Sequence, residues 1–134
     1  MAQCAKAKEL ILKTDDKVGM LADLTSVIAS QGVNITALCG YSMEGVAIFM
    51  IVTSDNEKVK AIASEQGWSV QENDVIVVSI PNAVGAAQTV AEKIKAANLN
   101  LKYCYGTTCD CDPKCSCNMV LRADDNDAVI ATLS

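Results

Sequence analysis

The sequence predicts an α+β fold in which two βαββαβ units with antiparallel sheets follow one another along the chain. Three observations lead to this prediction. The chain matches itself at an offset of 66 residues, both halves have the same order of apolar patterns, and turn residues stand at matching places. With 134 residues, of which 51% are hydrophobic, the chain has enough apolar material for two very small units.

The matched positions lie mostly at turns and at the ends of elements. They include three pairs of identical residues, Ile28 with Ile94, Asn34 with Asn100 and Gly40 with Gly106. After a four-residue insertion in the second half, Asp55-Asn56 matches Asp125-Asn126. Because the order of elements also agrees, the chain is interpreted as a tandem repeat.

The first repeat contains six expected elements. Helices are expected at residues 19–31, where Leu21, Leu24 and Ile28 form an apolar stripe, and at residues 56–66 behind the capping candidate Asp55. Strands are expected at residues 9–13, 33–41, 46–52 and 68–72. Since each helix has a single apolar stripe, we expect both helices to cover one face of the sheet.

The second repeat contains only the first five of these elements. Strands are expected at residues 75–79, 99–107 and 116–122, and helices at residues 85–97 and 126–133. Val90 and Ile94 are expected to be buried. No residues are left for a sixth element, so the expected domains are residues 1–73 and an incomplete second unit, residues 74–134.

The missing strand has three possible sources. Only Asn73-Asp74 separates the strands at 68–72 and 75–79, a spacing that suits a tight hairpin. A hairpin would give one sheet ordered 2-3-1-4-1′-3′-2′, with a strand shared by the two units. Alternatively, a second chain supplies the strand, or the chain is truncated. In each case exposed sheet edges favour a homodimer.

Two motifs in each repeat resemble the signature of ACT domains, which have a ferredoxin-like βαββαβ fold. Residues 16–21 (DKVGML) resemble the family's polar-x-Pro-Gly-x-Leu turn, and residues 32–35 (GVNI) resemble its Gly-Val/Ile-Asn-Ile segment. Residues 82–87 and 98–101 resemble these motifs less closely. The sequence departs from the family at the proline, replaced by Val18 and Val84, and at the leucine, replaced by Ala87.

The resemblance implies a non-catalytic module that binds an amino acid or a similar metabolite, usually at an interface between modules, and regulates an enzyme or a transcription factor. The strand-to-helix turn suits this role because the first N–H groups of a helix attract anions. Asp16 is expected to receive an ammonium group, and asparagine both donates and accepts. The candidate ligand-binding residues are Asp16, Val18, Gly19, Met20, Leu21, Asn34, Asn82, Gly85 and Asn100.

Four cysteines in the insertion of the second repeat, at 109–117, form a separate candidate site. If residues 112–114 form a loop, the sulfurs of Cys109, Cys111, Cys115 and Cys117 lie on one side of a hairpin. Such a cluster suits Zn or Cu, and it also suits disulfide or other redox chemistry. A Cys-rich loop without either role is the third alternative.

Composition argues against several functional classes. The net charge is −5 and the basic residues are scattered, which disfavours binding to nucleic acid or to an anionic membrane. The chain has no histidine, and no catalytic constellation supports an enzyme. The N-terminus has no apolar signal segment, so a cytoplasmic location is expected. The alternative to a sensor is a structural or interaction module.

Overall fold

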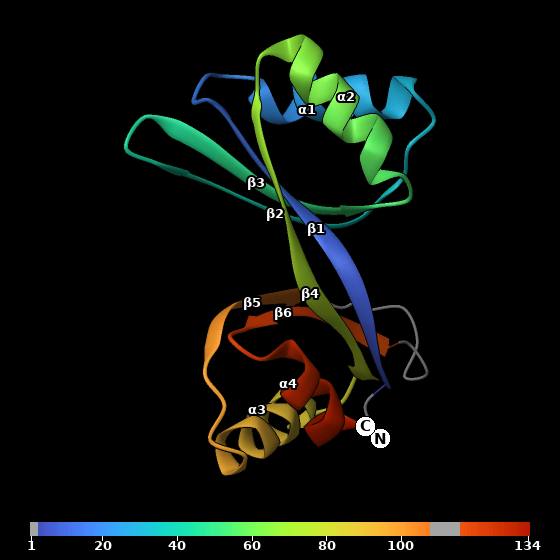
Figure 1. The fold of residues 1–134 in the computed structure, drawn as a ribbon, viewed down its shortest axis with the longest axis vertical. Coiled ribbons are helices and arrows are strands. Elements are labelled where there is room, and N and C mark those ends of the chain that lie inside the picture. Colours follow the sequence, from blue (N-terminus) through green and yellow to red (C-terminus); the bar gives the residue numbers. More distant parts are fainter. Residues whose placement is uncertain (1–2, 108–115) are drawn as a thin grey trace. The chain divides into compact units, whose positions relative to one another are not determined.

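The structure is a computed structural model that describes residues 3–107 and 116–134. It contains one six-stranded sheet and four helices, which confirms the predicted α+β fold (Figure 1). The elements are β1 (Gln3–Asp15), α1 (Met20–Ser30), β2 (Ile35–Met43), β3 (Val46–Thr53), α2 (Asn56–Gln66), β4 (Ser69–Pro81), α3 (Ala86–Ala96), β5 (Leu101–Thr107), β6 (Ser116–Ala123) and α4 (Asn126–Leu133).

α2 and α4 have the predicted bounds, because local capping groups are present, whereas α1 and α3 each begin and end one residue inside the predicted range. The Asp55 side chain accepts a hydrogen bond from the backbone N–H of Lys58 at 3.2 Å and so caps α2. The backbone of Gly67 has a φ of 74°, the left-handed conformation that ends the same helix. Asp125 caps α4 in the same way, through the N–H of Ala128 at 2.9 Å.

The predicted hairpin at Asn73-Asp74 is wrong, because residues 69–81 form the single strand β4. A two-residue hairpin turn needs positive φ at one or both central residues, and neither Asn73 nor Asp74 has one. The side chain of Asn73 is buried and accepts a hydrogen bond from the Gln71 side chain at 3.0 Å. The chain therefore runs straight through this point.

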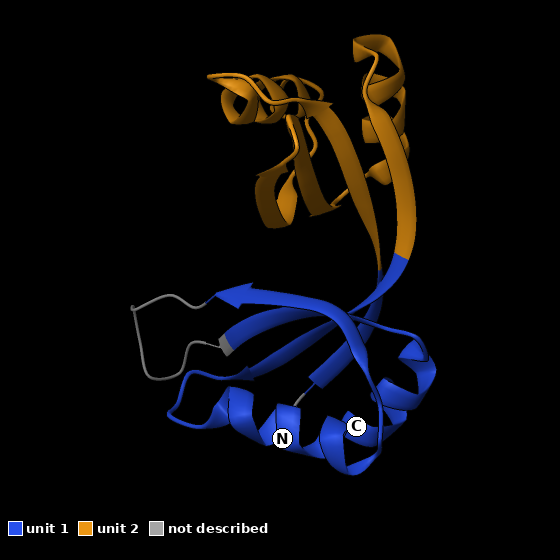
Figure 2. Ribbon diagram, turned by 90° about the vertical axis from the view of Figure 1, so that its left-hand side faces the viewer, with its two compact units in different colours: residues 1–7, 74–134 blue, residues 8–73 orange. Residues whose placement is uncertain are grey.

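The start of β1 supplies the missing strand of the second repeat. The chain divides into an N-terminal unit, residues 8–73, and a C-terminal unit, residues 1–7 and 74–134, coloured orange and blue in Figure 2. The expected first domain of residues 1–73 is therefore corrected at its first seven residues. β1 is 13 residues long, far longer than the predicted strand, and Cys4 near its start packs against the core of the C-terminal unit.

Both units thereby have the same four-stranded arrangement. The strand order is β2-β3-β1-β4 in the N-terminal unit and β5-β6-β4-β1 in the C-terminal unit, which is the order 2-3-1-4 in each repeat. The pairs β1–β3, β2–β3, β4–β6 and β5–β6 are antiparallel. The strand that completes the second repeat thus comes from the same chain.

Each unit has its own apolar core, formed between its helices and one face of its strands. Leu24, Ile28, Val90 and Ile94 are buried as predicted. Leu21 is the exception, because half of its surface is exposed. The buried stripe of α1 consists of Met20, Leu24 and Ile28, spaced by four residues, so Leu21 lies beside this stripe rather than in it.

In each unit, an asparagine at the start of the second helix forms hydrogen bonds that connect this helix to a neighbouring strand. The Asn126 side chain accepts a hydrogen bond from the Ala123 N–H at 2.9 Å and donates one to the Asp74 carbonyl at 2.9 Å. The Asn56 side chain accepts from the Thr53 hydroxyl at 2.6 Å and donates to the Lys8 carbonyl at 3.2 Å. Lys8 and Asp74 are the residues at which β1 and β4 pass from one unit into the other.

We predict that Asn126→Ala lowers the free energy of unfolding by about 1–2 kcal/mol, because two hydrogen bonds are lost and the Ala123 N–H is left without its acceptor. Urea denaturation measures this change. The control is Asn118→Ala on the exposed side of β6, for which we expect a change within about 0.5 kcal/mol. Equal effects of the two substitutions would contradict the role of Asn126 in connecting α4 to its neighbouring strands.

Candidate functional site

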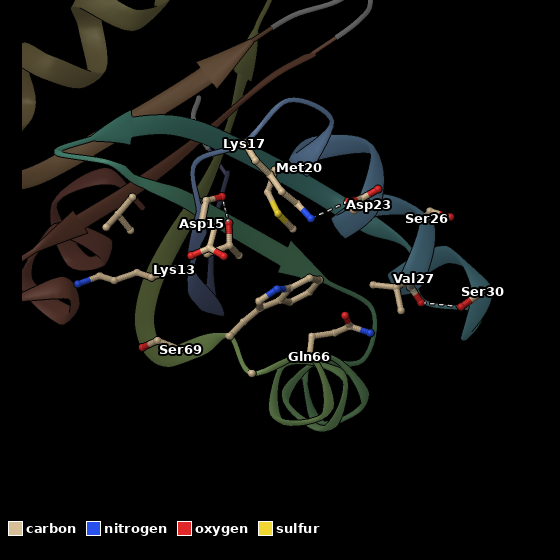
Figure 3. A pocket seen from close by; sticks show the side chains of 14 residues that line it. Lys13, Asp15, Lys17, Met20, Asp23, Ser26, Val27, Ser30, Gln66 and Ser69 are labelled. Carbon is tan, nitrogen blue, oxygen red and sulfur yellow. Dashed lines mark hydrogen bonds and ion pairs between the residues drawn. The ribbon is translucent and has the colours of Figure 1, made fainter.

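The N-terminal unit contains a cavity of about 810 Å³ beside the first turns of α1. It lies between the end of β1, the start of α1 and the turn that joins α2 to β4 (Figure 3). Its lining consists of Lys13, Thr14, Asp15, Lys17, Met20, Asp23, Ser26, Val27, Ser30, Val46, Gln66, Gly67, Trp68 and Ser69. This volume is in the range of small-molecule sites.

Charges of both signs stand around the cavity. Lys17 forms an ion pair with Asp23 at 3.5 Å, and more than half of each side chain is exposed. An ion pair this exposed contributes little to stability, so both groups can turn to a ligand at small cost. Lys13 and Asp15, from the last three residues of β1, add a second cation and a second carboxylate.

The remaining wall is partly apolar and carries several hydroxyl groups. Met20 is buried, and Val27 and Trp68 are partly buried against the core of the unit. Trp68 is held at the end of α2 by its backbone N–H, which donates to the Ala63 carbonyl at 2.9 Å. The Ser30 hydroxyl donates to the Val27 carbonyl at 2.7 Å. The cavity therefore combines an indole and a thioether with polar groups.

The turn before α1 leaves helix N–H groups open to a ligand. Gly19 has a φ of 84°, and no side chain caps the helix. The Met20 N–H donates to the Lys17 carbonyl at 3.2 Å, and the Asp23 N–H donates to the Gly19 carbonyl at 2.9 Å. The N–H groups between these two have no acceptor in the preceding turn, and with the helix dipole they favour an anion.

The structure separates the predicted site residues. Of the five at the turn, Met20 lines the cavity, whereas Asp16, Val18 and Leu21 are exposed and do not. Asn34 follows the other end of α1, about 16 Å from the Gly19 turn along a helix of 11 residues, and it does not line the cavity, which extends along α1 as far as Ser30. The backbone N–H of Asn34 donates to the Ser54 hydroxyl at 2.9 Å, and its carbonyl accepts from the Ser54 N–H at 2.9 Å. A ligand role for Asn34 stays a prediction.

The second repeat shows the same separation. Gly85, with a φ of 83°, stands before α3, and the Asn82 side chain accepts a hydrogen bond from the Cys117 thiol at 3.8 Å. Asn100 lies beyond the other end of α3, in a hollow of about 450 Å³ with Asn98 and Lys95. Within the C-terminal unit, α3 thus stands between the turn and Asn100.

Sequence reasoning missed the segment from Gln66 to Ser69, which forms one wall of the cavity. The predicted strand order contains the signal that would have identified it. In the order 2-3-1-4, the last strand of a unit lies next to the first, so the start of β4 comes beside the end of β1. A site at the β1–α1 turn is then expected to include residues just after α2.

Three of the four clustered cysteines, Cys109, Cys111 and Cys115, lie outside the described residues, so the metal and redox alternatives stay predictions. Cys117 lies on β6, partly buried against the core of the C-terminal unit. In the described part of the chain, no three cysteine or carboxylate side chains gather as a metal site would require. Burial raises the pKa of the Cys4 and Cys39 thiols, which favours their protonated form.

No family model matches the chain, and no curated protein matches it significantly. Several solved structures are similar. The protein BT0572 from Bacteroides thetaiotaomicron has 27% sequence identity and a TM-score of 0.86, over 97% of this chain and 88% of that chain. The regulatory subunit of aspartate kinase from Thermus thermophilus, in its ligand-free form, has 11% identity and a TM-score of 0.69, over 98% of this chain and 93% of that chain.

A structure of aspartokinase alpha and beta subunits has 16% identity and a TM-score of 0.68, over 97% of this chain and 93% of that chain. This chain shares their fold. The similarity to these structures covers both repeats and confirms the ACT-like, ferredoxin-like fold. Within the described residues, none of the helices has the length and apolar character needed to cross a membrane.

We predict that Gly19→Ala lowers the free energy of unfolding by about 1–2 kcal/mol through backbone strain alone. A Cβ at this position would meet no atom within 4 Å, so no steric clash is added to the cost of the left-handed conformation. Gly19→Asn should cost less, because asparagine tolerates this conformation. Chemical denaturation of the two variants checks the order, and an alanine variant as stable as the parent would contradict it.

Proposed function

We propose that the chain is a non-catalytic regulatory module that binds a free amino acid or a similar zwitterionic metabolite in the cavity of its N-terminal unit. Ligand binding would then tune a partner enzyme. The observation that carries the proposal is the lining of this cavity, which offers two lysines and two aspartates in one small-molecule-sized volume next to the uncapped start of α1.

The charges define how a zwitterion would bind. A carboxylate suits the N–H groups at the start of α1, with Lys17 beside them. An ammonium group suits Asp15 or Asp23, since carboxylates accept charged hydrogen bonds. Trp68 and Met20 would then contact the apolar part of the ligand. A ligand that breaks the Lys17–Asp23 pair replaces a weak, exposed interaction with two of its own.

A regulatory role is supported by the fold of the similar proteins. Two of them are described as a regulatory subunit of aspartate kinase and as aspartokinase subunits, and both cover almost the whole of this chain. The fold alone does not identify the ligand or the enzyme. Because β2 and β5 are the edge strands of the sheet, we include a homodimer, formed along one of these edges, in the proposal.

The test is a titration of the protein with each of the twenty amino acids. Trp68 is the only tryptophan of the chain and lines the cavity, so its fluorescence reports on binding there. Calorimetry gives the affinity. We predict saturable binding of at least one amino acid at millimolar concentration or below. Lys17→Met should weaken binding about tenfold or more, because a hydrogen bond to a charged group is lost.

The matched control is Lys58→Met, because Lys58 is an exposed lysine on α2 that does not line the cavity. This variant should bind with the parent affinity. If no amino acid changes the fluorescence or the heat at millimolar concentration, the proposal is wrong. An equal loss in the two lysine variants would mean that the ligand responds to overall charge and not to this cavity.

A further inference from the structure

The C-terminal unit has a cavity of its own beside the start of α3, with a different chemistry. Its volume is about 290 Å³. It is lined by residues of β4, α3, β5 and β6, and of the turn before α3, namely Ile80, Ala83, Ala86, Ala87, Cys104, Tyr105, Gly106, Thr107, Cys117 and Met119. The lining contains no aspartate, glutamate, lysine or arginine, in contrast to the lining of the larger cavity.

The repeat explains why this space is open. Ala86 and Ala87 stand where the first repeat has Met20 and Leu21. In the N-terminal unit the Met20 side chain is buried and fills the space under the start of α1. The short side chain of Ala86 therefore leaves a hollow at the start of α3, whereas Ala87 matches Leu21, which is half exposed in the first repeat.

The sheet beneath shows a second replacement of the same kind. Gly40 is paired with Phe49 in the N-terminal unit, and Gly106 is paired with Met119 in the C-terminal unit. The Phe49 ring lies 3.1 Å from the position of a Cβ on Gly40 and so covers that glycine. A flexible, unbranched methionine stands at the corresponding place in the second unit.

The floor of the hollow has to be glycine. A Cβ at Gly106 would lie 2.8 Å from the backbone oxygen of Asn118 and 3.1 Å from the Cγ of Met119. Gly106 is exposed and Cys117 is partly buried, so the hollow runs from the surface to the core of the unit. A ligand can therefore enter without opening the fold.

The lining determines the class of ligand. A zwitterion would leave its charges without partners of opposite sign, which costs several kcal/mol for each group removed from water. An apolar molecule would lose no hydrogen bonds and would gain contact with Ile80, Met119 and the alanines. The volume corresponds to roughly ten water molecules, so a ligand of roughly six to ten heavy atoms fits.

We propose that this cavity is a second ligand site, specific for a small uncharged aliphatic or alicyclic molecule. The site is independent of the amino-acid site proposed for the N-terminal unit, because the two cavities have no residue in common. The two repeats thus carry cavities of opposite chemistry beside the start of their first helices, charged in the first and apolar in the second.

The experiment is a titration with cyclohexanol, followed by NMR of protein labelled at the methionine methyl groups. The Met119 methyl signal should shift saturably with millimolar affinity, while the Met20 signal in the other unit stays in place. Glycine and aspartate serve as charged probes and should leave Met119 unchanged. A Met119 shift that does not saturate, or equal shifts at Met20 and Met119, would overturn the proposal.

Two variants fill the cavity, and one serves as a control. Ala86→Met, which restores the residue of the first repeat, and Ala87→Leu should each weaken cyclohexanol binding at least tenfold. Ala96→Met, on the same helix and outside the lining, should bind as the parent does. If Ala86→Met does not fold, as its methyl spectrum will show, Ala87→Leu decides. Parent affinity in the folded cavity-filling variant overturns the proposal.

Discussion

The rest of the structure depends on one constraint: residues 3–7 of β1 complete the part of the sheet that belongs to the C-terminal unit. The second repeat ends after its fifth element, so its sheet has three strands of its own. Residues 3–7 fill the fourth place, and the same strand continues as the first strand of the N-terminal unit. A three-stranded sheet would leave β4 at an unprotected edge, and its backbone groups would need another partner.

This constraint also determines where the ligand cavities lie. In the order 2-3-1-4, the first strand of each unit is central and leads directly into the first helix. The strand-to-helix turn therefore follows a strand that has a neighbouring strand on each side. In the N-terminal unit the start of β4 comes beside this turn and brings Trp68 and Ser69 to the cavity. The C-terminal unit has a cavity beside the corresponding turn, but β5 supplies one of its walls in place of the residues that follow the second helix.

Much of the fold follows from local signals in the sequence. α2 and α4 have the predicted bounds because Asp55 and Asp125 cap them, and these caps depend on neighbouring residues only. The first half of β1 is not predicted, since the alternating residues Ala5-Lys6-Ala7-Lys8 are types with low strand propensity and include no large apolar side chain. Its strand conformation comes from pairing with residues distant in the sequence, which a local pattern does not record.

The site was predicted in part for the same reason. The turn at Gly19 and the role of Met20 have a local signature, whereas the wall formed by Gln66 to Ser69 depends on the neighbouring position of two strands. Asn34 belongs to the family-like motif, but α1 holds it away from the turn within one unit. Leu21 also continues the apolar spacing of Leu24 and Ile28, but the residue that is buried at the start of α1 is its neighbour Met20.

Hydrogen exchange of the full chain and of a chain lacking residues 1–7 tests the central claim most directly. The account predicts that the amides of residues 74–81 that point toward β1 lose protection in the shortened chain, because their acceptors are gone, whereas the amides bonded to β6 keep theirs. The amides of α1 and α2 should keep theirs, since the N-terminal unit consists of residues 8–73 alone. Unchanged protection of residues 74–81 in the shortened chain would contradict the account.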